Sequence, residues 1–171
     1  MSLQLIEARD VSREQYLDYI AEWKRDGHRI VPASSDPKEM TFEQMLKKWS
    51  DEKSDHMYDL GLVPATTYFL VDEQGKVYGS LNLRHSLNNY LLKVGGHIGY
   101  GIRPSMRRKG YASMMLRQVL LICREMKLEK VLITCDEDNL ASAKTIEKFG
   151  GVLDNKVEDN QTIKRRYWLT L

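Results

Sequence analysis

The sequence predicts an α+β fold: one mixed, mostly antiparallel sheet of about seven strands flanked by about four helices. Apolar residues alternate or cluster in seven short segments and recur at helical spacing in four longer ones. These segments follow the order β-α-α-β-β-β-α-β-α-β-β, a meander leading into a strand–helix–strand–helix unit. The 171 residues are enough for one domain with its own core, so a single domain over 1–171 is expected.

The first half of the chain predicts a strand, two helices and a hairpin. Ser12 and Thr41 each begin a capping box, with a Gln three residues later, and open helices over 13–25 and 41–51. Gly27 is expected to end the first of them. The other elements expected before residue 97 are strand 3–8, strands 66–72 and 77–84, and a short helical turn at 87–93.

The second half predicts three strands around two helices, then a returning strand. The segment 110–126 carries an apolar stripe at spacings of three and four, as expected of an amphipathic helix. Residues 130–135 are almost continuously apolar, which favours a central strand. The remaining expected elements are strand 97–102, helix 140–149, and a final hairpin of 152–157 with 162–171.

Composition narrows the classes of partner. The formal net charge is +2, which is too small to indicate a nucleic-acid or membrane-surface partner. No apolar run approaches the roughly 18 residues of a membrane helix, and the N-terminus has no signal-peptide pattern. Cys123 and Cys135 do not have the spacing of a metal site or a disulfide framework. We therefore expect a cytoplasmic protein with no metal, no nucleic-acid partner and no membrane partner.

Positive charge precedes the helix predicted at 110, in the run Arg107, Arg108 and Lys109. Cations are unfavourable at a helix N-terminus unless an anion binds there. The first turn of a helix has unpaired backbone N–H groups which, with the helix dipole, bind anions. Gly110 allows a ligand to approach the backbone, and Ala112 keeps the next turn narrow. A diphosphate matches this turn best, and a solvated basic loop is the alternative.

The segment Arg107-Arg-Lys-Gly-Tyr-Ala112 resembles the pyrophosphate-binding signature Arg/Gln-x-x-Gly-x-Gly/Ala of the GNAT superfamily of acyl-CoA-dependent N-acyltransferases. It lacks the Lys-Ser/Thr ending of a P-loop and is not a G-x-G-x-x-G turn. The strand at 96–104 and the segment 139–150 are similar to neighbouring segments of that family. The element order agrees with the family fold over nearly the whole chain. The run 95–100, with 83–85 upstream, resembles a bacterial subgroup of predicted acetyltransferases.

The resemblance implies that acetyl-CoA is the acyl donor. In the family, its pantetheine arm lies where the strand before the signature separates from its neighbour, and the first two helices and their loop line the acceptor site. The cofactor-binding residues implied in this way are Tyr100, Gly101, Ile102, Arg103, Arg107, Arg108, Lys109, Gly110, Tyr111, Ala112, Asn139 and Ser142.

The implied chemistry is direct attack of an amine on the thioester. An alkylamine is mostly protonated at pH 7, so a base must remove a proton. Many relatives place a Glu ten residues before the first Arg/Gln of the signature, and His97 occupies that position here. His97 is therefore the preferred base, since an imidazole titrates near neutrality. His85 is the second candidate, and a structural histidine is the alternative interpretation of His97.

The acid and the acceptor-binding residues are less defined. Many relatives carry a Tyr seven residues after the Asn of the second segment, but this sequence has Ile146 there. Tyr111 is a candidate acid, Tyr100 and Cys135 are alternatives, and unassisted release of the thiolate is another. Arg84 and His85 end a strand. Both are candidate substrate-binding residues, with Arg84 placed either to bind a carboxylate or at a solvated strand end.

The sequence therefore predicts an N-acetyltransferase that moves the acetyl group of acetyl-CoA to a primary amine of a small molecule, such as an amino acid, a polyamine or an amino sugar. A protein or peptide amine is the alternative acceptor. A non-catalytic acyl-CoA-binding module is the rival interpretation, and Ile146 favours it. Edge strands near the C-terminus are compatible with a homodimer.

Overall fold

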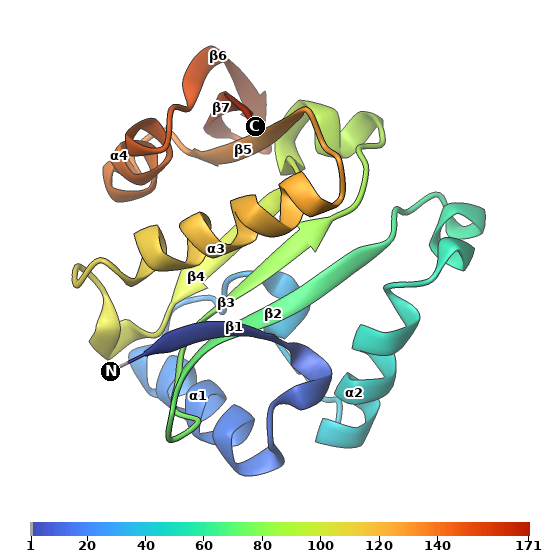
Figure 1. Ribbon diagram of the computed structural model, residues 1–171, viewed down its shortest axis with the longest axis vertical. Coiled ribbons are helices and arrows are strands. Elements are labelled where there is room, and N and C mark those ends of the chain that lie inside the picture. The colour runs from blue at the N-terminus through green and yellow to red at the C-terminus, as the bar shows by residue number, and fades with distance from the viewer. Residues whose placement is uncertain (1) are drawn as a thin grey trace.

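The computed structural model describes residues 2–171, and over this range seven strands and four α-helices follow one another in the predicted order (Figure 1). The strands are β1 Leu3–Glu7, β2 Ala65–Asp72, β3 Val77–Arg84, β4 Ile98–Ile102, β5 Lys130–Asp136, β6 Val152–Asp159 and β7 Thr162–Thr170. The α-helices are α1 Arg13–Asp26, α2 Phe42–Asp51, α3 Tyr111–Glu125 and α4 Leu140–Lys148.

All seven strands form one sheet in the order β1-β2-β3-β4-β5-β7-β6. Every neighbouring pair is antiparallel except β4 and β5, which are parallel. β4 and β5 pair only at Ile98 and Ile133, whereas β4 pairs with β3 from Ile98 to Ile102. The two parallel strands therefore separate beyond Ile98 (Figure 1). This separation confirms the gap that the sequence resemblance implied.

Local sequence signals start and stop the first two helices as predicted. Ser12 Oγ accepts from the N–H of Gln15 at 3.2 Å, and Gln15 Oε1 accepts from the N–H of Ser12 at 3.0 Å. Thr41 and Gln44 make the same reciprocal pair at the start of α2. Gly27 ends α1 with φ of 77°, in the left-handed region that glycine adopts without a side-chain clash.

Each face of the sheet has its own core. Met115 of α3, Ile146 of α4 and Leu81 of β3 are fully buried in the core on one face. Tyr16 of α1 and other α1 and α2 side chains pack around Phe69 on the opposite face. Burial of each such large side chain contributes about 1.5–3 kcal/mol. The two cores hold the helices in place on opposite sides of β4, which lies at the centre of the sheet.

Two short segments differ from the expectation. Asp55–Leu60 is a 3-10 helix, an element that was not among those expected from the sequence. Ser54 caps it, since Ser54 Oγ accepts from the N–H of His56 at 3.2 Å, and such short helices carry no apolar stripe to reveal them. Leu91–Gly95 is a π-helix. It begins four residues later and ends two residues later than the helical turn expected at 87–93. None of the helices in residues 2–171 is long and apolar enough to cross a membrane.

Candidate active site

A cleft of about 810 Å³ lies where β4 leads into α3, and we call it the β4–α3 cleft. Its walls come from β4, the turn before α3, the first turns of α3 and α4, and the loop after α1. The predicted cofactor residues that line it are Tyr100, Gly101, Ile102, Arg107, Arg108, Gly110, Tyr111, Ala112, Asn139 and Ser142. Residues from three separate parts of the sequence are thus brought to one cavity.

The start of α3 presents a row of free backbone donors. In the part of the chain that the structure describes, the N–H groups of residues 108–113 have no hydrogen-bond acceptor, and no side chain caps the helix. Gly110 is the N-cap with φ of 85°, and a Cβ there would meet no atom within 4 Å. Space, unpaired amides and the positive end of the helix dipole coincide, as an anion-binding turn requires.

The three cations before α3 have different environments. The Arg107 guanidinium lies 4.9 Å from the Trp23 ring centre, and its Nη1 is 3.4 Å from Asp26 Oδ2. Arg108 lines the cleft and makes no ion pair or hydrogen bond through its side chain within residues 2–171. Lys109 donates from Nζ to the carbonyl of Ser105 at 2.9 Å and does not line the cleft. Of the three, Arg108 is the cation most available to a bound anion.

The β4 edge of the cleft joins the start of α4. Beyond Ile98, the backbone of β4 on the side of β5 has no strand partner. The Tyr100 hydroxyl lies 2.9 Å from Ser142 Oγ, and Asn139 caps α4 by accepting from the N–H of Ser142 at 3.1 Å. On the opposite face of β4, a Cβ at Gly101 would lie 2.1 Å from the carbonyl oxygen of Val31. Only glycine at 101 therefore allows the loop after α1 to close over β4.

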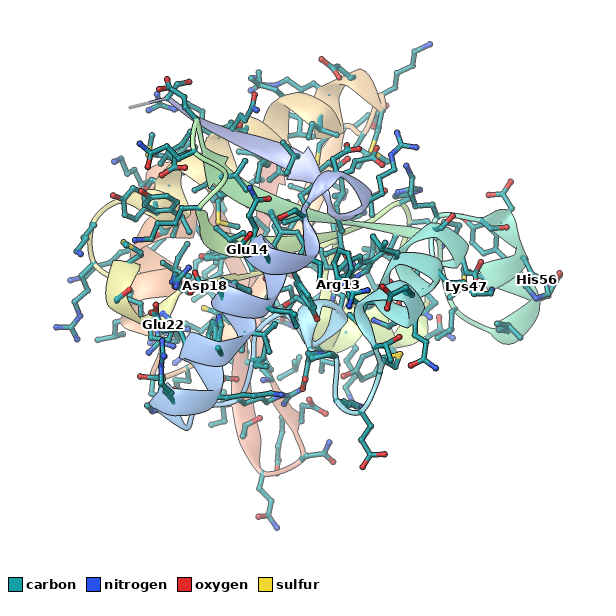
Figure 2. The ribbon with its side chains drawn as sticks, turned by 90° about the horizontal axis from the view of Figure 1, so that it is seen from below. Arg13, Glu14, Asp18, Glu22, Lys47 and His56 are labelled. Carbon is teal, nitrogen blue, oxygen red and sulfur yellow. The ribbon has the colours of Figure 1, made fainter. Side chains whose placement is uncertain are left out.

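Arg103 was expected to hold the cofactor through its backbone, and its side chain is buried on the other side of the sheet. Its Nε donates to Glu22 Oε2 at 2.5 Å, its Nη2 to Asp18 Oδ2 at 2.8 Å, and its Nη1 to the carbonyl of Val77 at 3.2 Å. Asp18 and Glu22 lie one turn apart on α1 (Figure 2). Even the N–H of Arg103 is used, since it donates to the Tyr78 carbonyl at 2.9 Å. Arg103 therefore ties α1 to the sheet.

His97 is buried and does not line the β4–α3 cleft. Its Nδ1 accepts from the backbone N–H of Leu132 at 2.9 Å. An amide N–H can only donate, so Nδ1 is unprotonated and the neutral ring carries its proton on Nε2. Burial and the nearby charge of Arg84 lower the pKa of His97 to about 4. Neither ring nitrogen is free to accept a proton from an amine, so the geometry favours the structural interpretation of His97.

We therefore expect His97→Ala to affect stability more than chemistry. The variant leaves the buried N–H of Leu132 without an acceptor, which costs about 1–3 kcal/mol in the free energy of unfolding. Turnover per folded molecule should change little, whereas loss of a general base lowers it roughly 100- to 10,000-fold. Denaturant unfolding and steady-state kinetics measure the two effects. His97→Asn, whose carbonyl can replace Nδ1, should recover stability. A fall in turnover of the size of a lost base, in a fully folded variant, would restore His97 to the catalytic role.

The other catalytic candidates are also placed by the fold. His85 Nε2 lies 2.8 Å from Thr66 Oγ1, outside the cleft, and burial together with Lys53 lowers the pKa of His85. Burial raises the pKa of the Cys135 thiol to about 11, which disfavours a thiolate nucleophile. Ile146 is fully buried in the core, so the position of the family tyrosine packs against the sheet. No group of His, Cys, Asp or Glu side chains among the described residues could hold a metal ion.

Arg84 lies in a second pocket, of about 350 Å³, on the α1 and α2 face of the sheet. Its neighbours there include Lys48 and Glu52 of the α2 end, which sequence analysis did not single out. Glu52 follows α2 as its C-cap, and nothing in the local sequence marks it. Trp23 and Val31, which line the main cleft, were also missed as site residues. The loop at 29–36, with its proline, was the available signal for Val31.

Comparison with known proteins identifies the family. The acetyltransferase (GNAT) domain model matches residues 6–152. The chain therefore belongs to the GNAT acetyltransferase family. The uncharacterized N-acetyltransferase YjdG of Bacillus subtilis (strain 168) is 36% identical over 61 residues, a match that spans 34% of this chain and only 36% of that protein.

Solved structures of two other acetyltransferases share the fold. The ribosomal L7/L12 alpha-N-protein acetyltransferase RimL, in complex with coenzyme A, superposes with a TM-score of 0.68 at 16% identity, covering 100% of this chain and 95% of its own. The spermidine/spermine N-acetyltransferase SpeG from Vibrio cholerae gives 0.63 at 16% identity, covering 99% and 95%. One acts on a protein and the other on polyamines, so the fold does not specify the class of acceptor.

Proposed function

We propose that this protein transfers the acetyl group of acetyl-CoA to a primary amine of a small molecule. The observation that carries the proposal is the β4–α3 cleft, where six unpaired amides at the start of α3 lie beside the unpaired edge of β4. The first feature suits a diphosphate and the second suits an extended, amide-containing arm that pairs with a strand edge. Coenzyme A combines both groups in one molecule.

The residues present fit such a ligand. The amides of residues 108–112 and the Arg108 side chain would hold the pyrophosphate, since Gly110 leaves open space beside them. The backbone of β4 from Tyr100 to Ile102 would pair with the pantetheine arm. Asn139 and Ser142 would line its other side. Acetyl-CoA supplies an activated thioester carbonyl, and the residues of this chain position it and exclude water.

The reaction joins the amine nitrogen to the thioester carbon as the carbon–sulfur bond breaks. The nitrogen loses a proton to a base or to water, and the sulfur of coenzyme A gains one. Tyr100 is better placed as the proton donor than Tyr111. The Tyr111 ring packs 4.8 Å from that of Tyr78, near the α3 end of β4, whereas Tyr100 lies closer to the point where β4 meets β5. Burial raises the pKa of Tyr100, so its hydroxyl keeps its proton at neutral pH.

The proposal is tested by measuring release of free thiol from acetyl-CoA with a panel of small primary amines and with peptides. We expect acetyl-CoA to bind and at least one small amine to raise thiol release well above the rate of hydrolysis. Binding without turnover on any amine would support the rival, non-catalytic acyl-CoA-binding module. Turnover confined to peptides would instead support a protein or peptide acceptor, the class of the RimL neighbour.

A further inference from the structure

The second pocket is built from several segments that meet at one end of the sheet. The end of α2 contributes Lys48 and Glu52, and the end of β3 contributes Asn82 and Arg84. The start of β2 and the segments 33–34, 57–63 and 88–91 complete it. Successive side chains of β3 point to opposite faces of the sheet. Asn82 and Arg84 therefore face α1 and α2, while Leu81 and Leu83 face α3. Of the described residues that line this pocket, Ala33 alone also lines the β4–α3 cleft.

Arg84 is a partly buried cation without an anion. Its Nη1 donates to the carbonyls of Gly95 and Gly96 at 3.1 and 3.5 Å, and no carboxylate lies within ion-pair distance of it in the described structure. Burial lowers the pKa of Arg84, and the charge of Glu52 in the same pocket offsets only part of this effect. Its remaining N–H donors, on Nε and Nη2, have no acceptor within residues 2–171. A partly buried guanidinium with free donors on Nε and Nη2 is suited to bind a carboxylate.

The ion pair of Lys48 and Glu52 also lines this pocket. Glu52 Oε1 lies 3.2 Å from Lys48 Nζ, but Glu52 Oε2 is buried and has no hydrogen-bond donor among residues 2–171. A buried carboxylate oxygen without a donor is unfavourable. Ser34 also lines the pocket, and its Oγ is likewise buried and without a partner in the described chain. An ammonium group in the pocket would supply the donor that Glu52 Oε2 lacks once the carboxylate turned toward it.

The second pocket lies next to the β4–α3 cleft. Ala33, which precedes Ser34, lines both cavities. Across the sheet, Asn82 is the register partner of Gly99 in β4. A Cβ at Gly99 would lie 3.3 Å from Arg84 Nη1, so the guanidinium rests on the bare backbone of β4. The two cavities therefore adjoin at Ala33.

We propose that the second pocket binds the acceptor and that the acceptor is an amino acid, with its carboxylate on Arg84 and its amino group toward Glu52 and the cleft. This inference rests on the proposed function and specifies its substrate class. A polyamine would bring only positive charge to Arg84 and Lys48, and an amino sugar would leave Arg84 without an anion. A zwitterion satisfies both the cation and the carboxylate oxygen that the fold leaves unpaired.

The test compares each of a panel of L-amino acids with its own carboxamide, and includes spermidine. The carboxamide keeps the amino group and the side chain and removes only the negative charge. Calorimetric titration on the protein alone and with saturating coenzyme A measures binding, and thiol release from acetyl-CoA measures turnover. We expect at least one amino acid to bind about tenfold or more tightly than its carboxamide, the size of one lost charged hydrogen bond.

Variants assign the preference to residues. Arg84→Gln should remove the preference for the amino acid while leaving the Kd for coenzyme A unchanged. Glu52→Gln should weaken binding of the amino acid and its carboxamide alike, because both carry the amino group. Lys47→Gln is the matched control, since Lys47 lies on α2, is exposed and pairs only with Asp51. Thermal melting checks folding. If Arg84→Gln fails to fold, the affinities of the wild-type protein for each amino acid and for its carboxamide still test the proposal.

The outcomes separate this inference from the proposed function. A tenfold preference for amino acids without any thiol release would support the pocket and overturn the enzymatic proposal. Thiol release with spermidine or carboxamides, and equal or weaker binding of the amino acids, would support the enzyme and overturn the inference. Retention of the preference in Arg84→Gln would also overturn it.

Discussion

Gly110→Glu is expected to weaken binding of coenzyme A by at least about 100-fold, close to 2.7 kcal/mol. The glutamate side chain would enter the open space beside the free amides of α3, where the diphosphate is proposed to lie. Its carboxylate would both fill that space and repel the phosphates, since like charges at close range disfavour each other strongly. Calorimetric titration with coenzyme A measures the loss.

Two controls separate this effect from backbone strain. Gly110 has φ of 85°, so any side chain there costs about 1–2 kcal/mol of stability. Gly110→Ala carries that strain without the charge or the bulk, and should retain most of the affinity. Gly150→Glu places the same residue at a φ of 90°, also in open space, but outside the cleft. Unchanged affinity in Gly110→Glu would contradict the placement of the cofactor, whatever the controls show.

Arg103→Met is expected to lower the free energy of unfolding by about 2–3 kcal/mol. The substitution removes three hydrogen bonds and leaves the Glu22 carboxylate, which is only 16% exposed, without its cation. The loss should fall below that of a fully buried pair because Asp18 is 59% exposed and can be hydrated. Denaturant unfolding measures it. Arg13→Met is the control, since Arg13 pairs with Glu43 at the surface and should change stability little.

The same variant should change how stability depends on pH. Burial acts to raise the pKa of Glu22, but hydrogen bonds from the Ser105 N–H and from Arg103 lower it below its ordinary value of 4.5. An acid with a lowered folded-state pKa stabilises the protein above its unfolded pKa, and this contribution is lost as pH falls through the folded value. The wild type should therefore lose stability below about pH 4.5, and Arg103→Met should lose less. If both proteins lost the same stability below about pH 4.5, the ion pair of Arg103 and Glu22 would contribute nothing to the pH dependence.

Local signals in the sequence were enough for most elements and for one part of the site. The capping residues Ser12 and Thr41 and the turn at Gly27 act within a few residues of themselves, and each forms the bonds or the φ that the sequence predicts. The anion-binding turn at Gly110 is of the same kind, because the unpaired amides at the start of a helix follow from helix geometry alone.

The surroundings of the Arg103 and His97 side chains depend on neighbours that are distant in the chain. Arg103 directly follows β4, and its side chain lies on the face of the sheet that packs on α1. Its ion pairs with Glu22 and Asp18 therefore depend on the docking of α1. His97 Nδ1 accepts the hydrogen bond from the N–H of Leu132 because β5 lies beside it. Spacing along one strand gives the face of a residue but not what covers that face.

By itself, the sequence determined the family, the order of the elements and the turn that suits a diphosphate, because these depend on local backbone geometry and short-range pattern. The tertiary structure alone decided which charged groups lack a counter-ion. Arg84 and Glu52 come together only through the pairing of β2 with β3 and the docking of α2. Among the described residues, Arg84 is left without an ion-pair partner and Glu52 Oε2 without a donor by burial that no local pattern encodes.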